Sequence, residues 1–140
     1  MKIYFAGAIR GGREDQKLYY TLIDYIGTKA EVLTEHVGLD TLSMVGENNL
    51  SDHEIFKRDV NWLKSAQGVI AEVTAPSLGV GYELGIAESM HKPVLCLFRN
   101  VNNMRLSAML RGNEKFFCKN YSSLKEAKNY IDAFLAKVSL

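Results

Sequence analysis

The chain has 140 residues, which is the size of one ordinary domain and enough to bury a core without disulfides or a structural metal. Its 17 Lys and Arg residues stand against 16 Asp and Glu residues, and no long run of either sign breaks this balance. The balance argues against a nucleic-acid polymer or an anionic membrane as the main partner, although a local phosphate site remains open. We therefore expect one domain over residues 1–140.

The N-terminus and the apolar segments point to an intracellular compartment. The opening stretch "MKIYFAGAIRGG" reaches glycine and arginine within a few residues, unlike a secretory leader. No apolar segment approaches the roughly 20 residues of a membrane-spanning helix. Cys96 and Cys118 lie in apolar runs without metal-type spacing, which is typical of buried thiols in a reducing compartment. We expect the protein in the cytoplasm, or also in the nucleus of a eukaryotic cell.

Short apolar runs alternate with amphipathic ones along the whole chain. The predicted strands are residues 2–7, 31–34, 68–73, 93–98 and 115–119, and their continuous hydrophobicity suits a parallel sheet that is buried on both faces. Residues 13–26 and 51–66 carry apolar side chains at helical spacing, and a short helix is expected near "LSAML". Ser51 with Glu54, and Ser123 with Glu126, have the spacing of capping boxes. The pattern predicts a doubly wound α/β domain with a five-stranded, mainly parallel sheet in flavodoxin-like (Rossmann-like) order.

In that strand order the first and third strands are neighbours where the order reverses, which is where open parallel sheets bind ligands. The loops that leave these strands, "GAIRGGRED" and "TAPSLGVGYELG", are the two glycine-rich loops of the chain. Neither is a P-loop or a dinucleotide fingerprint. Ser77 and the amides around Gly79 and Gly81 could hold a phosphate at the start of a helix, although such loops are often only tight turns.

Two carboxylates add a possible chemistry. Glu83 is expected in the first turn of the third helix, where the helix dipole favours its ionised form, and it could equally be an acid that only stabilises the helix. Asp59 lies on or beside the buried stripe of its helix, so it is either a hydrogen-bonded structural acid or an acid of raised pKa that faces the cleft. Two carboxylates in different roles suggest cleavage at an anomeric carbon.

Several blocks of residues together resemble the 2′-deoxynucleoside 5′-phosphate N-hydrolases, relatives of the nucleoside 2-deoxyribosyltransferases. The blocks are "IYFAGAIRGGRED", "VLTEHVG", "HEIFKRDVNWL", "VIAEVTAPSLGVGYELG", "LCLFR" and "LSAMLRG", and they cover most of the chain in order. The resemblance implies hydrolysis of the N-glycosidic bond of a deoxynucleoside monophosphate to the free base and 2-deoxyribose 5-phosphate, with neither a metal nor an organic cofactor.

The resemblance also implies roles for single residues. Glu83 resembles the nucleophile that forms a covalent deoxyribosyl-enzyme, and Asp59 resembles the acid that assists departure of the base. Tyr4 would place its hydroxyl near Glu83, whereas without the family it is a core aromatic of a buried strand. Ser77, Gly79 and Gly81 match the phosphate-binding loop.

Further positions are implied in the same way. Gly7, Ile9 and Arg10 match a loop that closes over the nucleotide, and His36 sits where the family approaches the base. Ser107 resembles a phosphate ligand from a second subunit, which implies a homodimer with shared sites; taken alone it is a helix-cap serine. Ala8 replaces a hydroxyl residue of close relatives and removes one hydrogen bond to the phosphate, worth ~1.5–3 kcal/mol.

Two other functions remain open. One is a deoxyribosyltransferase that acts on unphosphorylated nucleosides, against which Ser77 and Ser107 argue because a neutral 5′-hydroxyl needs no anion site. The other is a nucleotide-binding module without turnover, which the presence of Tyr4, Asp59 and Glu83 together makes less attractive. The base preference is expected to depend on residues 39–49, which carry no readable code.

Overall fold

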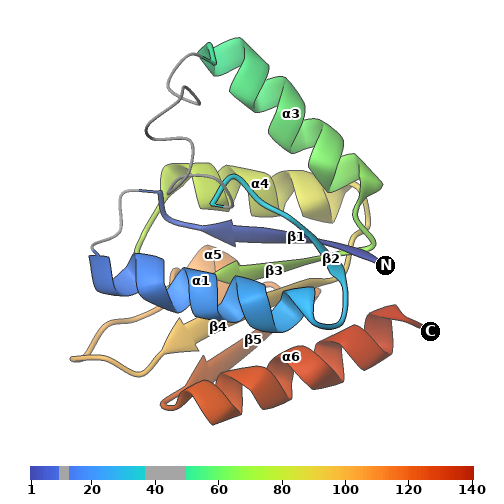
Figure 1. The fold of residues 1–140 in the computed structure, drawn as a ribbon. Coiled ribbons are helices and arrows are strands. Elements are labelled where there is room, and N and C mark those ends of the chain that lie inside the picture. The colour runs from blue at the N-terminus through green and yellow to red at the C-terminus, as the bar shows by residue number, and fades with distance from the viewer. Residues whose placement is uncertain (10–12, 37–49) are drawn as a thin grey trace.

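The protein is described by a computed structural model over residues 1–9, 13–36 and 50–140. Its sheet has five parallel strands in the order β2-β1-β3-β4-β5 (Figure 1). The strands are β1 Lys2–Gly7, β2 Glu31–Leu33, β3 Gly68–Glu72, β4 Val94–Arg99 and β5 Phe116–Tyr121. The helices are α1 Arg13–Gly27, α3 Asp52–Ser65, α4 Leu78–Ser89, α5 Ala108–Arg111 and α6 Leu124–Val138. The predicted doubly wound fold and flavodoxin-like strand order are confirmed.

Helices cover both faces of the sheet, so alternate residues of each strand enter two separate cores (Figure 1). Ile3 and Phe5 of β1 pack with α1 and α6 on one face. Tyr4 and Ala6 face the other core, which is shared with α3 and α4. Because side chains of β1 point alternately to the two faces, the Tyr4 side chain lies on the same side of the sheet as α3 and α4.

Side-chain caps fix where the helices start. Ser51 and Glu54 form the predicted capping box at α3. At α6 the Ser123 hydroxyl accepts from the Glu126 amide, but the Glu126 carboxylate accepts from the Ser122 amide instead of closing the box on Ser123. The predicted strand ends differ from the observed ones by no more than two residues. No helix among the described residues is long and apolar enough to span a membrane.

The start of α4 corrects one prediction. Ser77 caps this helix, which begins at Leu78, so the glycines at 79 and 81 lie inside the helix and not in a preceding loop. Glu83 is therefore in the second turn, and the prediction that it lies in the first turn is wrong. Each glycine in a helix costs about 1 kcal/mol, and the N-cap hydrogen bond together with burial of Val80, Leu84 and Ala87 offsets this cost.

The two cysteines are free and lie opposite each other in the register of β4 and β5. Cys96 is buried, as expected, whereas Cys118 is partly exposed, so the prediction of buried thiols holds for one of the pair. The Cys118 thiol donates to the Leu110 carbonyl at 3.3 Å, which ties α5 to the sheet.

Candidate active site

Three carboxylates from separate parts of the chain meet at the carboxyl edge of the sheet. Glu35 follows the end of β2, Asp59 lies on α3 and Glu83 lies on α4. One oxygen of each carboxylate lies within 4.8 Å of the others. Oxygens this close could share protons, act together on one carbon, or hold a divalent cation.

Tyr4 forms a hydrogen bond with Glu83. Its hydroxyl donates a hydrogen bond to Glu83 Oε2, as expected from the resemblance, and its side chain is only 1% exposed. Burial, followed by the nearby charge of Glu83, raises the pKa of Tyr4, so the phenol keeps its proton. Tyr4 is therefore a hydrogen-bond donor to the carboxylate and also a core aromatic, so the two interpretations of this residue hold together.

Arg58 links the other two carboxylates. Its Nε lies 3.0 Å from Asp59 Oδ1, and its Nη2 lies 3.5 Å from Glu35 Oε2. The guanidinium also lies over the Trp62 ring, 4.7 Å from the centroid. Two residues of α3, Asp59 and Trp62, therefore contact the Arg58 cation. The charge of Arg58 allows two acids to stay close to each other in a largely buried place.

Burial governs the protonation of the three acids. It raises the pKa of Glu83 to about 7, and the neighbouring Glu35 and Asp59 charges act in the same direction against the hydrogen bond from Tyr4. Burial also raises the pKa of Glu35 to about 7 and raises the pKa of Asp59, although Arg58 opposes both shifts. The expected helix-dipole stabilisation of ionised Glu83 is therefore outweighed by desolvation, whereas the raised pKa expected for Asp59 is found.

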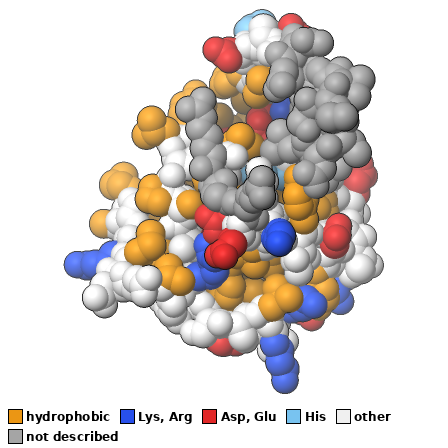
Figure 2. Space-filling view, turned by 60° about the vertical axis from the view of Figure 1, so that its left-hand side comes forward, with side chains coloured by type: hydrophobic (Ala, Val, Ile, Leu, Met, Phe, Trp, Pro, Cys, Tyr) orange, Lys and Arg blue, Asp and Glu red, His pale blue; other side chains and the backbone are white. Residues whose placement is uncertain are grey.

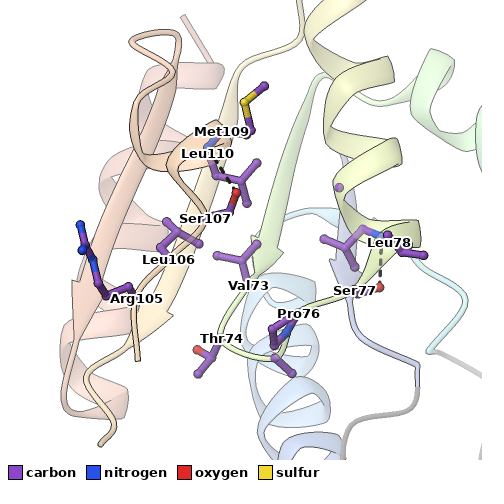
Figure 3. A pocket seen from close by; sticks show the side chains of 13 residues that line it. Val73, Thr74, Pro76, Ser77, Leu78, Arg105, Leu106, Ser107, Met109 and Leu110 are labelled. Atoms are coloured by element: carbon purple, nitrogen blue, oxygen red, sulfur yellow. Dashed lines mark hydrogen bonds between the residues drawn. The ribbon is translucent and has the colours of Figure 1, made fainter. Parts of the chain in front are cut away.

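A cavity of about 410 Å³ lies beside the start of α4 and brings Ser77 and Ser107 to its walls (Figure 3). Ser77 Oγ accepts from the Val80 amide at 3.2 Å, and Ser107 Oγ accepts from the Met109 amide at 3.2 Å, so each serine caps a helix. Among the described residues, the lining is mostly apolar and includes none of the three carboxylates. The cavity thus adjoins the predicted phosphate loop without being the reaction centre.

The glycines of the predicted phosphate loop differ in what they offer. The Gly81 amide donates to the Ser77 carbonyl at 3.1 Å, so it is used within the helix. A Cβ at Gly81 would meet nothing within 4 Å among the described residues, so the backbone is open to close approach there. The Gly79 amide lies two residues earlier, in the first turn of α4, where a helix has no internal acceptor for its N–H groups.

The remaining predicted positions lie around the end of β1. The His36 ring is 2% exposed, donates from Nε2 to the Gly7 carbonyl at 2.9 Å, and packs edge-on against Tyr19. Burial lowers the pKa of His36, so the ring is neutral. Ile9 is 39% exposed beside this edge, and Arg10 lies outside the described residues. Contacts of these residues with a nucleotide stay predictions.

Figure 2 brings the carboxyl ends of the strands forward. Acidic and basic side chains lie next to each other near its centre, and hydrophobic side chains gather over its left-hand part. The large exposed apolar side chains of α3, α4 and α5 are Phe56, Leu78, Tyr82 and Met109. Leu78 is 97% exposed and Met109 is 82% exposed, and both line the cavity of Figure 3.

Glu35 and Arg58 are site residues that sequence reasoning missed. Both lie inside the blocks that carry the family resemblance, directly before predicted site residues: Glu35 precedes His36 and Arg58 precedes Asp59. The pairing of Tyr4 with Leu33 places the end of β2 beside β1, so any polar residue soon after Leu33 reaches the same edge of the sheet. That signal was available once the strand order was predicted.

The chain is similar to known proteins over most of its length. The family model described as nucleoside 2-deoxyribosyltransferase matches residues 3–134. The 5-hydroxymethyl-dUMP N-hydrolase of Tetraodon nigroviridis is 51% identical over 125 residues, which cover 86% of this chain and 88% of that protein. The protein of the same name from Danio rerio is 53% identical over 112 residues, or 80% and 78% of the two chains. The structure of the Clostridium botulinum CMP N-glycosidase BcmB is similar in fold, with a TM-score of 0.71, 22% identity, and coverage of 96% and 99%.

Proposed function

Since the chain belongs to the nucleoside 2-deoxyribosyltransferase family, we propose that it hydrolyses the N-glycosidic bond of 2′-deoxynucleoside 5′-monophosphates. The products are the free base and 2-deoxyribose 5-phosphate. The names of the relatives at about half identity support hydrolysis of a nucleotide over transfer between nucleosides. The reaction would take place where nucleotides are held, in the cytoplasm or the nucleus.

The separation of the carboxylates is the observation that carries this proposal. Glycosidases that work through a covalent intermediate keep their two carboxyl groups about 5–5.5 Å apart, whereas those that admit a water in a single step keep them about 6.5–9.5 Å apart. The three oxygens of Glu35, Asp59 and Glu83 lie within 4.8 Å of one another. Single oxygens this close are compatible with the shorter arrangement of the carboxyl groups, and we therefore propose a two-step reaction through a covalent deoxyribosyl-glutamate.

In the first step Glu83 attacks the anomeric carbon and Asp59 gives a proton to the departing base. Tyr4 fixes one oxygen of Glu83, so the other oxygen is the one that bonds to the sugar. The raised pKa of Asp59 suits the role of a proton donor. In the second step a water attacks the same carbon, the bond from that carbon to Glu83 breaks and releases the ionised carboxylate, and Glu35, whose pKa is about 7, takes up the proton of the water.

The phosphate would bind at the start of α4. Ser77 can donate its hydroxyl proton while it accepts from the Val80 amide, and the Gly79 amide lies in the same first turn. Gly81 would let the nucleotide approach the backbone. Gly7, Ile9 and Arg10 would line the sugar side and His36 the base side.

The test is release of free base from purine and pyrimidine deoxynucleoside monophosphates, next to the matching nucleosides and ribonucleotides, with and without an acceptor base. We expect hydrolysis of the deoxy monophosphates alone, with the same rate after chelation of divalent cations. Glu83→Ala should abolish turnover and keep nucleotide binding. Glu88→Ala should keep both, because Glu88 lies on the same helix as Glu83 but its carboxylate accepts a hydrogen bond from Asn113, after α5. An active Glu83→Ala variant would remove Glu83 from the nucleophile role, and sugar transfer between unphosphorylated nucleosides would make the protein a transferase.

We further propose a homodimer in which Ser107 completes the phosphate site of the other subunit. The exposed Leu78 and Met109 flank a mainly apolar cavity that a second copy could cover. In one chain the Ser107 hydroxyl lies across this cavity from Ser77 (Figure 3).

Mixed dimers test the shared site. Ser107→Trp and Glu83→Ala each remove activity, but a dimer of one subunit of each kind would hold one site with both residues intact. Equal mixing after dissociation should then restore about one quarter of the wild-type activity, because half of the dimers are mixed and each has one intact site. No recovery in verified mixed dimers would mean that Ser107 does not act across the interface.

A further inference from the structure

A fourth carboxylate, that of Glu72, lies at the same edge of the sheet but outside the cluster of Glu35, Asp59 and Glu83. It is the last residue of β3 and is 0% exposed. Burial raises the pKa of Glu72, while hydrogen bonds from Tyr121 and Thr74 and the charge of Arg99 favour its ionised form. A buried carboxylate is costly unless every oxygen is paired, so its partners show what it holds in place.

The first partner is the connection that leads to the predicted phosphate loop. Glu72 Oε1 accepts the Thr74 amide at 2.8 Å, and the Thr74 hydroxyl oxygen accepts the Arg99 amide at 2.9 Å. Thr74 is thus fixed through its backbone and its side chain, three residues before Ser77 caps α4. The connection from β3 to the predicted phosphate loop therefore begins at a residue, Thr74, that is held by two hydrogen bonds.

The second set of partners joins neighbouring strands to α1. The Tyr121 hydroxyl at the end of β5 donates to Glu72 Oε2, and Arg99 Nε at the end of β4 lies 3.6 Å from the same oxygen. The Arg99 guanidinium also donates through Nη2 to Asp15, in the first turn of α1. One carboxylate therefore connects the ends of β3, β4 and β5 with the start of α1.

We propose that Glu72 is a positioning residue for phosphate binding: it fixes Thr74 in the connection from β3 to α4, and through Arg99 it fixes Asp15 in the first turn of α1. This inference rests on the proposed function. Glu83 depends less on Glu72 than Ser77 does, because Glu83 lies in the body of α4 next to the buried Leu84, whereas Ser77 precedes the helix and follows Thr74 by three residues. Loss of Glu72 should therefore weaken phosphate binding while leaving the chemical step nearly unchanged.

The experiment uses Glu72→Gln and Tyr121→Phe in the full chain, with Tyr25→Phe as the matched control. Tyr25→Phe also removes a phenol hydrogen bond to a carboxylate, that of Asp132. Tyr25 lies near the end of α1 and Asp132 lies on α6, and neither belongs to the proposed site. We expect KM for the monophosphate to rise about tenfold in both variants, which corresponds to roughly 1.4 kcal/mol, with kcat within about twofold of wild type. The dissociation constant of 2-deoxyribose 5-phosphate, measured by calorimetry, should rise by the same factor, and the control should change neither value.

Variants that melt at a lower temperature but keep the wild-type KM and dissociation constant would reduce Glu72 to a structural acid and overturn the proposal. If Glu72→Gln does not fold, Tyr121→Phe decides, since it removes one hydroxyl and keeps the ring. If the wild type binds 2-deoxyribose 5-phosphate but hydrolyses no monophosphate, the proposed reaction fails and the dissociation constants still decide the role of Glu72. If it neither binds nor hydrolyses, both proposals fall.

Discussion

Replacement of Tyr4 by phenylalanine should move the pH dependence of the reaction. The Tyr4 hydroxyl donates to the ionised form of Glu83 and so lowers the pKa of that carboxyl, which burial raises to about 7. A hydrogen bond to a charged group contributes about 1.5–3 kcal/mol, or about 1–2 pKa units. In Tyr4→Phe the pKa of Glu83 should therefore rise to about 8–9.

The sign follows from the role of Glu83 as nucleophile. Only the ionised carboxylate attacks, so kcat/KM rises with pH through the pKa of Glu83, and this acid limb should move to higher pH in Tyr4→Phe. At pH 7 the ionised fraction falls from about one half to roughly 1–10%, so kcat/KM should fall about 5- to 50-fold relative to wild type, and the ratio of the two should approach one above pH 9.

Initial rates of base release between pH 5 and 10 measure this shift. Tyr130→Phe on α6 serves as the control, because that residue belongs to the opposite face of the sheet and should keep the wild-type profile. An equal loss at every pH, with the acid limb unmoved, would refute the reasoning, since it would show that the hydroxyl does not set the protonation of Glu83.

Two further predictions concern stability. The pKa of Glu35 is raised to about 7 from an ordinary 4.5, so its protonated form favours folding below pH 4.5 and this contribution is lost as the pH rises through 7. Glu35→Gln should therefore raise the free energy of unfolding by roughly 1–3 kcal/mol at pH 8 and leave it nearly unchanged at pH 4 in urea titrations; an equal effect at both pH values would contradict the pKa argument. A Cβ at Gly7 would lie 3.1 Å from the buried Tyr19 ring, so Gly7→Ala should lower the free energy of unfolding by about 1–3 kcal/mol, and an unchanged value would show that the ring can move aside.

The fold was predictable because strand order and pattern agree. Continuous apolar runs indicated the five strands, and the alternation with helical segments left few topologies for a parallel sheet. The expected burial on both faces holds for the inner strands β1, β3 and β4, whereas the edge strands β2 and β5 are partly exposed. Strand ends were less predictable, since residues such as Arg99 and Tyr121 extend strands through hydrogen bonds that apolar pattern does not report. The start of α4 was misjudged because glycine at 79 and 81 favours a loop, and the cap at Ser77 together with the packing of Val80 and Leu84 in the core overrides that preference.

The site was predictable in part. Tyr4 and Glu83 come from different elements, yet the resemblance placed them together and the structure joins them by a hydrogen bond. The raised pKa values of Glu83 and Glu35 could not be predicted, because they depend on how deeply each acid is buried and on its neighbours. Glu72 was invisible for the same reason: in the sequence it is one acid at the end of an apolar run, and only the packed sheet shows its partners.

The place of Trp62 gives this protein an internal optical probe. It is the single tryptophan of the chain, and its indole lies against the Arg58 guanidinium, which is paired with Asp59 and Glu35. Any event that moves Arg58, such as protonation of those acids or entry of a nucleotide, changes the charge beside the indole. Emission from Trp62 should therefore follow ligand titrations without an attached dye, and a Trp62→Phe variant would supply the blank.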